Sequence, residues 1–92
     1  MTQFGTNEQS TQEMLETLTK IYGPILPSRT LWRILGYTSP AAFRQARIRE
    51  QIPVVEFEIE GRRGRFALTS DVANWLTKIR AEAIILNEKL HE

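Results

Sequence analysis

Residues 31–51, LWRILGYTSPAAFRQARIREQ, decide the fold that this sequence predicts. An apolar helical segment runs up to Gly36, and glycine often ends a helix because it tolerates the left-handed backbone found there. Three residues later Ser39 stands where an N-cap is needed, and Pro40 suits the first position of the following helix. Two short helices joined by so short a glycine-containing turn are typical of a helix-turn-helix.

The sequence on both sides of this turn predicts further short elements of a mostly helical domain. Apolar residues recur at helical spacing over 11–22 and 29–35. Ser28 is expected to be the N-cap of the second of these helices. The helix after the turn is expected to cover 40–51. Residues 23–28, GPILPS, are expected to form an extended connection, because each proline disfavours helix in the residue before it.

A β-hairpin is predicted after this third helix. VVEFEIE, residues 54–60, alternates apolar and acidic side chains, RFAL, residues 65–68, is the return strand, and GRRG between them is a turn signal. With the turn centred between its two arginines, apolar residues face apolar residues and opposite charges face each other, as a stable register requires. The expected pairs are Ile59 with Phe66, Phe57 with Leu68 and Glu60 with Arg65.

A long helix is predicted over 71–90, with Thr69 or Ser70 as its N-cap. Its first part, with Trp75, is expected to pack on the domain, whereas AIILNEKL extends beyond what so small a core covers. Apolar residues in this helix follow a heptad spacing. They either form a homodimer or pack against the N-terminal helix, and both interpretations stay open. The seam residues are Leu76, Ile79, Ala83, Leu86 and Leu90.

The chain of 92 residues is long enough for one small domain. Residues 1–10 are polar and show no period, so we expect a flexible tail followed by a single domain over 11–92. There is no cysteine, which excludes disulfides and thiolate metal sites. No apolar run reaches the roughly 20 residues of a membrane helix. Because the N-terminus also lacks the pattern of a signal peptide, we expect a cytoplasmic protein.

Nothing in the sequence favours catalysis. The only histidine is His91, near the C-terminus, and no phosphate-binding or dinucleotide-binding glycine pattern is present. The alternating glutamates Glu56, Glu58 and Glu60 are expected to form one solvated face of a strand rather than a metal or acid–base cluster. We therefore expect neither an enzyme nor a requirement for a cofactor or metal.

Positive charge is concentrated in the centre of the chain. Eight arginines and four glutamates lie from Arg29 to Arg65, a net charge of +4, whereas the remaining residues carry −3 and the whole chain +1. This central segment contains no lysine. Because the planar fork of arginine suits bidentate contacts to phosphate and guanine, the pattern favours a nucleic-acid surface, although arginines are also common on ordinary surfaces.

The recognition helix predicted over 40–51 carries the candidate base contacts. Residues near the start of such a helix reach base edges, and those farther along meet phosphates. Arg44 therefore suits guanine and Gln45 suits adenine, while Arg47 and Arg49 suit phosphates. The alternative is an ordinary solvated helix face.

The wing tip predicted over 61–64 carries Arg62 and Arg63. A hairpin that follows a helix-turn-helix can place its tip in the adjacent minor groove or along the backbone, and a narrow minor groove attracts arginine. The alternative is an edge hairpin whose charges oppose aggregation. That alternative explains the glutamates well but explains two adjacent like charges at the tip less well.

The segment 26–76 resembles the excisionase/AlpA-type branch of the MerR-like winged helix-turn-helix proteins. The resemblance is carried by LGYTS, the IP after the third helix, GRRGRF and DVANWL, and it covers a little over half of the chain. Members of this branch have a glycine where Glu50 stands and an aromatic or polar residue where Arg44 stands. By position, the resemblance places DNA contacts on Ser39, Arg44, Gln45, Arg47, Arg62, Arg63 and Arg65.

This resemblance implies an α+β, mostly helical fold. It would be a winged helix-turn-helix with a two-stranded β-hairpin wing, to which this chain adds N- and C-terminal helices. The implied function is that of a small DNA-binding protein, a transcription regulator or an excisionase that directs a recombinase, in phages and other mobile elements. The expected partners are double-stranded DNA, a second copy or cooperative multimer on DNA, and a recombinase or other protein.

Two other classes of function compete with this interpretation. A protein-interaction module, such as an adaptor or anti-repressor, would explain the near-neutral net charge and the two amphipathic terminal helices. RNA binding is disfavoured because Phe57 and Phe66 are needed for the core and leave no exposed stacking aromatics in the hairpin. Salt dependence discriminates between these classes, because affinity for DNA falls steeply with salt in proportion to the phosphates contacted.

Overall fold

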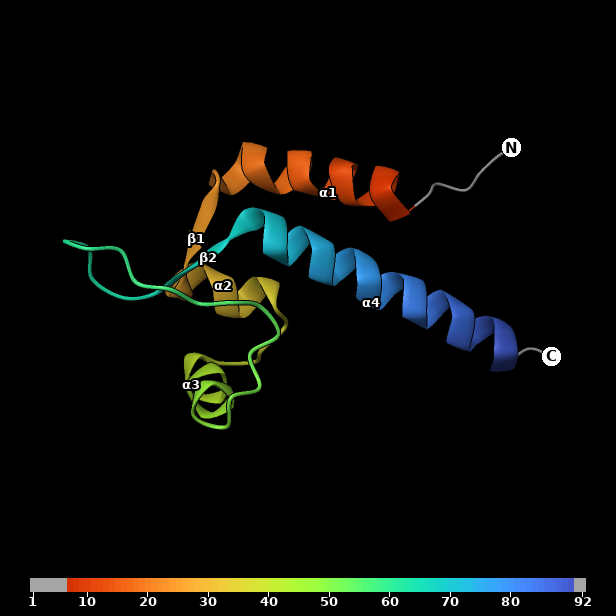
Figure 1. The fold of residues 1–92 in the computed structure, drawn as a ribbon. Helices are drawn as coiled ribbons and strands as arrows, with labels where there is room; N and C mark the ends of the chain where they lie inside the picture. Colours follow the sequence, from red (N-terminus) through yellow and green to blue (C-terminus); the bar gives the residue numbers. More distant parts are fainter. Residues whose placement is uncertain (1–6, 91–92) are drawn as a thin grey trace.

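The structure, a computed structural model, describes residues 7–90 and contains four helices and two short strands within that range. The expected α+β, mostly helical class is confirmed (Figure 1). The elements in chain order are α1 (Asn7–Tyr22), β1 (Ile25–Pro27), α2 (Ser28–Ile34), α3 (Pro40–Ile48), β2 (Phe66–Leu68) and α4 (Thr69–Leu90).

The first helix begins earlier than the sequence predicts. Helix α1 starts at Asn7, so the last four residues of the expected tail are helical. The rest of that tail, residues 1–6, and the histidine at position 91 lie outside the described residues. No helix within the described range is both long enough and apolar enough to cross a membrane.

The two strands pair with each other in an antiparallel sheet. Of the residues 23–28 that were expected to be extended, Ile25–Pro27 form strand β1 rather than a bare connection, and Ser28 is already helical. The register sets Ile25 opposite Leu68 and Pro27 opposite Phe66, with Leu26 and Ala67, both fully buried, between them. Leu68 pairs with Ile25 of β1, and it forms no bridge to Phe57, which pairs with Phe66 instead.

The predicted hairpin is reduced to a single bridge. The N–H and C=O groups of Phe57 and Phe66 bond to each other at 2.9 Å in both directions. This pairing differs by two positions from the expected one, so the same faces of the strands still meet. All three expected pairs are wrong, because the register is shifted by two residues and the pairing does not continue beyond this bridge, while the other edge of β2 pairs with β1.

Residues 58–65 consequently form a loop, which we call the arginine loop. It contains a turn in which the N–H of Arg62 bonds to the carbonyl of Ile59 at 3.0 Å. Gly61, with φ of 81°, occupies the third position of this turn, where a type II turn requires positive φ. In Figure 1 the loop projects from one end of the molecule, and the C-terminal end of α4 lies at the other.

The turn between α2 and α3 forms as predicted. Gly36 has φ of 91°, its N–H bonds to the carbonyl of Arg33, and the N–H of Tyr37 bonds to that of Trp32, both at 3.0 Å. This is a Schellman ending. Ser39 caps α3 as expected, since its Oγ accepts from the N–H of Ala42 at 3.0 Å.

The other expected caps are wrong for one shared reason. Strand β1 runs directly into α2, so Pro27 occupies the N-cap position and Ser28 is already helical. Strand β2 runs directly into α4, which begins at Thr69. Thr69 is fully buried, and its hydroxyl donates to the carbonyl of Gly23 at 2.6 Å instead of capping the helix.

Helix α3 ends three residues before the predicted boundary. Glu50 adopts φ of 56° and closes a second Schellman ending, in which its N–H bonds to Arg47 at 3.0 Å and that of Gln51 bonds to Ala46 at 2.8 Å. Glu50 thus occupies the left-handed position that glycine normally takes. The backbone leaves α3 abruptly there and turns toward the arginine loop.

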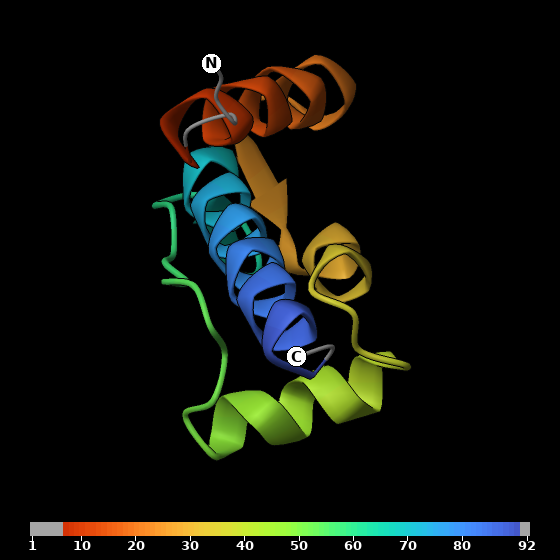
Figure 2. The same ribbon diagram turned by 90° about the vertical axis from the view of Figure 1, so that its right-hand side faces the viewer.

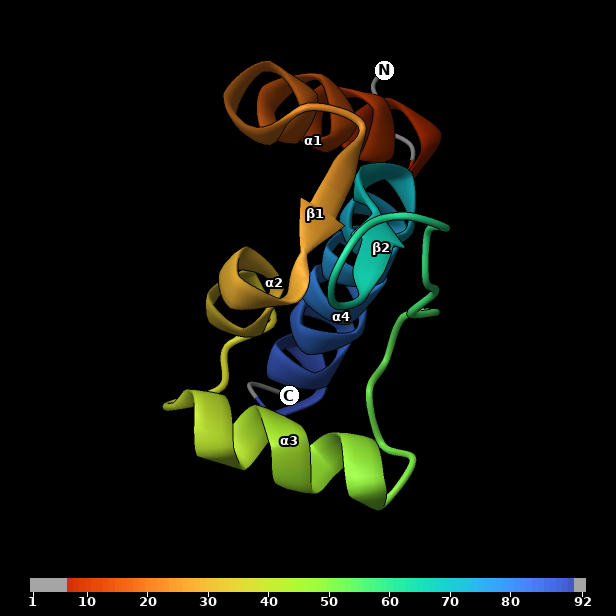
Figure 3. The ribbon, with the colours of Figure 1, turned by 90° about the vertical axis from the view of Figure 1, so that its left-hand side faces the viewer.

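The core lies between the sheet, α2 and the first turns of α4. Leu26, Leu31, Ala67, Val72 and Ala73 are fully buried there. Helix α1 packs along α4, on the side of α4 opposite to α3 (Figures 2 and 3). This arrangement leaves the outer faces of α3 and the arginine loop free of both long helices.

The outer half of α4 extends beyond the core. Ile79 is 41% exposed, Leu86 57% and Leu90 72%. Helix α1 therefore does not cover the outer part of the predicted heptad seam, and the interpretation in which the seam packs against the N-terminal helix fails for these residues. Leu76, at the inner end of the seam, packs partly against the core.

Candidate nucleic-acid interface

Helix α3 presents two chemically different faces. Phe43 and Ala46 are buried, and the ring of Tyr37 meets that of Phe43 edge-on, with 5.4 Å between the ring centroids. Arg44 and Gln45, the predicted base contacts, are exposed. Because the buried pair is spaced three residues apart, it anchors one side of the helix and leaves the other side to solvent.

Arg47 does not share this free face. Its Nε and Nη2 donate to the two carboxylate oxygens of Glu56, each at 2.7 Å. Nη2 also donates to Ser28 Oγ at 3.2 Å, and the guanidinium lies 4.9 Å from the centroid of the Phe43 ring. Four contacts within the protein thus hold the side chain of Arg47, which we predicted from the sequence to contact a phosphate. Arg49, the other predicted phosphate contact, is exposed.

Glu56 does not lie on the solvated face that the sequence predicted for it. Its side chain is only 6% exposed, whereas Glu58 and Glu60 are exposed, so the three glutamates do not form one solvated face. The hydrogen bonds from Arg47 hold the pKa of Glu56 below its usual value, and the positive charge of Arg47 adds to this effect while burial opposes it. The same hydrogen bonds raise the pKa of Arg47.

The alternation in residues 54–56 is inverted relative to the prediction. Val54 is buried and Val55 is 68% exposed, so Glu56 turns inward with Val54. The alternation of apolar and acidic residues predicted that Glu56 would face solvent, because a glutamate is usually solvated. The opposite charge of Arg47 is the one feature of the sequence that could have predicted this arrangement. No local sequence pattern, however, indicates that residues 47 and 56 meet.

Ser28 joins the second arm of the arginine loop to this pair. Its N–H donates to the carbonyl of Arg65 at 3.0 Å. Its Oγ lies 3.1 Å from the same carbonyl and 3.3 Å from Glu56 Oε2, and its single hydrogen can serve one of the two at a time. We call Arg47, Glu56 and Ser28 the Arg47–Glu56–Ser28 cluster. It lies where α2, α3 and both arms of the loop meet.

The arginine loop carries the remaining predicted contacts. Arg62, Arg63 and Arg65 are exposed, and in the described part of the chain no salt bridge involves them. The base of the loop is fixed by the Phe57–Phe66 bridge, whose rings lie 6.4 Å apart. Three cationic side chains are therefore available to solvent on a loop whose two ends are held.

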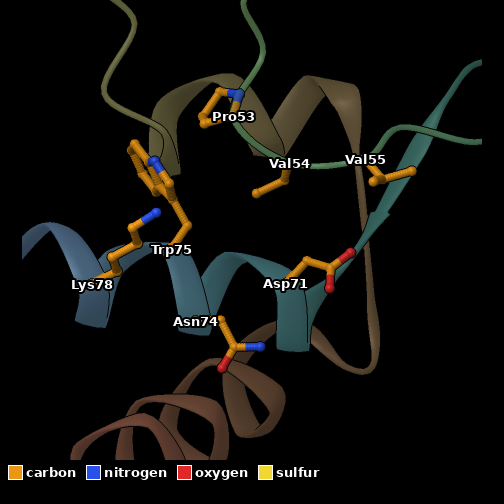
Figure 4. Close-up of a pocket in the computed structure, with 7 residues that line it drawn as sticks. All are labelled: Pro53, Val54, Val55, Asp71, Asn74, Trp75 and Lys78. Carbon is orange, nitrogen blue, oxygen red and sulfur yellow. The ribbon is translucent and has the colours of Figure 1, made fainter. Parts of the chain in front are cut away.

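An open pocket lies between residues 53–55 and α4 (Figure 4). Its walls come from Pro53, Val54, Val55, Asp71, Asn74, Trp75 and Lys78. The ionisable side chains among them are the carboxylate of Asp71 and the ammonium group of Lys78. Within residues 7–90 no cluster of histidine, aspartate or glutamate side chains is suited to hold a metal ion.

Seven of the eight residues predicted to contact DNA thus lie at the surface or at the start of a helix. Ser39 is the cap of α3, the side chain of Arg47 is bound to Glu56 and Ser28, and the exposed residues are Arg44, Gln45, Arg49, Arg62, Arg63 and Arg65. Comparisons of the chain with protein-family models, with curated proteins and with solved structures gave no match.

Proposed function

We propose that this protein binds double-stranded DNA in a sequence-specific manner, as a small transcription regulator or an excisionase-like accessory factor of a mobile genetic element. In this proposal α3 enters the major groove and the arginine loop contacts the minor groove or the backbone. The fold around them would serve as a winged helix-turn-helix, with α2 and α3 as the two helices of the motif.

The observation that carries this proposal is the free face of α3, on which Arg44 and Gln45 lie together with the exposed Ile48. Arg44 and Gln45 are exposed in the middle of α3, a helix that Ser39 caps and that Phe43 anchors from behind. These two side chains have the hydrogen-bonding groups that read guanine and adenine in the major groove. The exposed arginines of the loop add positive charge, and no ion pair within residues 7–90 engages them.

We further propose that two copies act together. A single small module makes few base contacts, so useful specificity generally requires a second copy or a neighbour. The outer seam of α4, which α1 leaves exposed, is the surface proposed for this association. A recombinase would be the further partner if the protein acts as an excisionase.

Selection of bound duplexes from a random library, at low and at moderate salt, tests the function directly. We expect a recovered motif, with a repeated half-site if two copies bind. Affinity for the motif should fall steeply with salt, because each neutralised phosphate releases counterions. Recovery of no motif at either salt would contradict the proposal.

A protein-interaction module is the second candidate function. Exposed apolar side chains at two places favour it, Val55 at the open pocket and Leu86 with Leu90 one turn apart on α4, since exposed apolar surface often marks a protein partner. Weak binding to DNA with little dependence on salt, together with tight binding to a protein, would favour this candidate.

A further inference from the structure

We infer that Glu56 and Ser28 are positioning residues of the DNA-binding surface, and that Arg47 pairs with Glu56 rather than with a phosphate. Through the Arg47–Glu56–Ser28 cluster, α3 and the arginine loop are held as one rigid unit. The effect on DNA recognition rests on the proposed function, whereas the rigidity does not and can be measured without DNA.

The connectivity of the cluster supports this inference. Glu56 directly precedes Phe57 and Arg65 directly precedes Phe66, so the cluster grips each arm of the loop beside the Phe57–Phe66 bridge. Arg47 lies on α3, between the buried Ala46 and the end of the helix. Contacts through side chains and one backbone carbonyl thus link the recognition helix to both ends of the loop.

The hydrogen-bonding capacity of the pair explains why Arg47 stays in place. Both oxygens of Glu56 accept from Arg47, and a bidentate pair of this kind is stronger and more directional than a single contact. The Glu56 side chain is 6% exposed and that of Arg47 28%. A phosphate that withdrew Arg47 would leave a nearly buried carboxylate without its cation, which is unfavourable.

The charges point the same way. Glu56 is an acidic residue close to a surface proposed to face DNA, where a free carboxylate would repel phosphates. Its pairing with Arg47 removes that repulsion and at the same time removes Arg47 from the cations available to DNA. The cluster is therefore electrically balanced, and the DNA contacts fall to Arg44, Arg49 and the loop.

The first experiment is done on the free protein with Glu56→Gln, which keeps the shape of the side chain and removes its charge. Glu58→Gln, an exposed glutamate two residues away, is the matched control. In NMR spectra we expect the Nε–H of Arg47 to be protected from exchange in wild type and Glu58→Gln, and to exchange rapidly in Glu56→Gln.

Residual dipolar couplings test the rigidity itself. In wild type one alignment tensor should fit the amides of α3 and of the arginine loop together, and in Glu56→Gln the two segments should require separate tensors. A common tensor in Glu56→Gln would overturn the inference. Circular dichroism shows whether the variants keep their helices.

The second experiment measures affinity for a selected duplex and for random duplexes as a function of salt. Because Glu56→Gln frees Arg47, we expect tighter binding to random DNA, a slope of log affinity against log salt steeper by about 0.9, and a ratio of specific to random affinity reduced about tenfold, the equivalent of one weakened base contact. Glu58→Gln should leave this ratio unchanged.

Arg47→Gln and Arg49→Gln complete the comparison. We expect Arg49→Gln to make the salt slope shallower by about 0.9, the value for one phosphate, and Arg47→Gln to leave the slope unchanged while reducing specificity. An equal loss of slope in both variants would make Arg47 a phosphate contact and overturn the inference. If wild type binds no DNA, the proposed function fails, and the tensor measurement alone decides whether the cluster couples the two segments.

Discussion

A single backbone angle at Glu50 defines the end of α3. Its φ of 56° is the only positive value at a non-glycine position in the described part of the chain. A side chain in this region has its Cβ close to a carbonyl oxygen, which costs about 1–2 kcal/mol. The two hydrogen bonds of the Schellman ending hold the strained conformation in place.

Replacing Glu50 with glycine should therefore stabilise the protein by about 1 kcal/mol, the relief of strain being partly offset by a more flexible unfolded chain. Urea unfolding followed by circular dichroism measures the change. Glu50→Ala is the control, because it removes the same charge and keeps the strain. Equal stabilisation by both substitutions would show that charge, and not φ, is responsible.

The ion pair of Glu56 predicts a dependence of stability on pH. Its pKa is about 4.3 in an unfolded chain and is lowered in the folded protein, chiefly by the hydrogen bonds from Arg47. The stabilisation is thus complete above the unfolded pKa and is lost as pH falls through the folded pKa. The advantage of wild type over Glu56→Gln should shrink from about pH 5 downward.

Unfolding in urea at a series of pH values checks this expectation. Glu58→Gln should follow the wild-type curve, since Glu58 is exposed. Parallel curves for wild type and Glu56→Gln would mean that the pair adds no stability that depends on pH.

At the residue scale, the sequence was informative wherever the partner was close along the chain. Ser39 caps α3 through a hydrogen bond with Ala42, three residues later in the chain. Gly36 ends α2 through a hydrogen bond with Arg33, three residues earlier. Ser28 and Glu56 were misassigned because their partners lie far away, 28 residues apart in the case of their mutual contact. Composition and spacing carry no information about such contacts.

At the scale of elements, the hairpin was wrong for a related reason. The alternation in residues 54–60 favoured the nearest partner, and a local hairpin has the smallest cost of loop closure. Strand β2 instead pairs with β1, where Leu26 and Ala67 fill the centre of the core. Helices α1, α2 and α4 were predictable because their apolar spacing is a local property.

Helix α3 provides the prediction that tests base reading. Arg44→Ala or Gln45→Ala should relax the sequence preference and cost about 1–3 kcal/mol at the selected site. Both side chains are exposed, so the fold should be unaffected. Competition binding against single-base variants of the site gives the measurement. An equal loss on random duplexes would assign these residues to the backbone instead.

The arginine loop should behave differently from α3. Arg62→Ala combined with Arg63→Ala is expected to weaken binding to all duplexes alike and to make the salt slope shallower by up to about 1.8, the value for two phosphates. Fluorescence anisotropy at several salt concentrations gives both quantities. Unchanged affinity for the selected site would exclude the loop from the interface.

At the scale of the whole molecule, α4 predicts association. The molecule is 49 Å long, and the exposed seam lies on the part of α4 that extends beyond the core. We expect a dimer whose population rises with concentration in sedimentation experiments. Leu86→Glu with Leu90→Glu should shift the protein to monomer by placing charges in an apolar contact.

Asn87→Glu is the matched control for this pair, because it adds charge to the same exposed turn of α4 away from the seam. It should leave the dimer intact. A wild-type protein that stays monomeric at every concentration would require that any cooperativity arise on the DNA.

The pairing of β1 with β2 also sets the order of events during synthesis. Residues 67–73 supply Ala67, Val72 and Ala73, which complete the core around Leu26 and Leu31. These two leucines lie some 40 residues earlier in the chain and are therefore synthesised first. At about 5–20 residues per second, Arg29 is synthesised roughly 2–7 s before Phe66 of the strand that fixes the segment, and Arg65 directly before it. The core around Leu26 and Leu31 can therefore be completed only after β2 and the first turn of α4 have been made, when every arginine of the segment is already part of the chain.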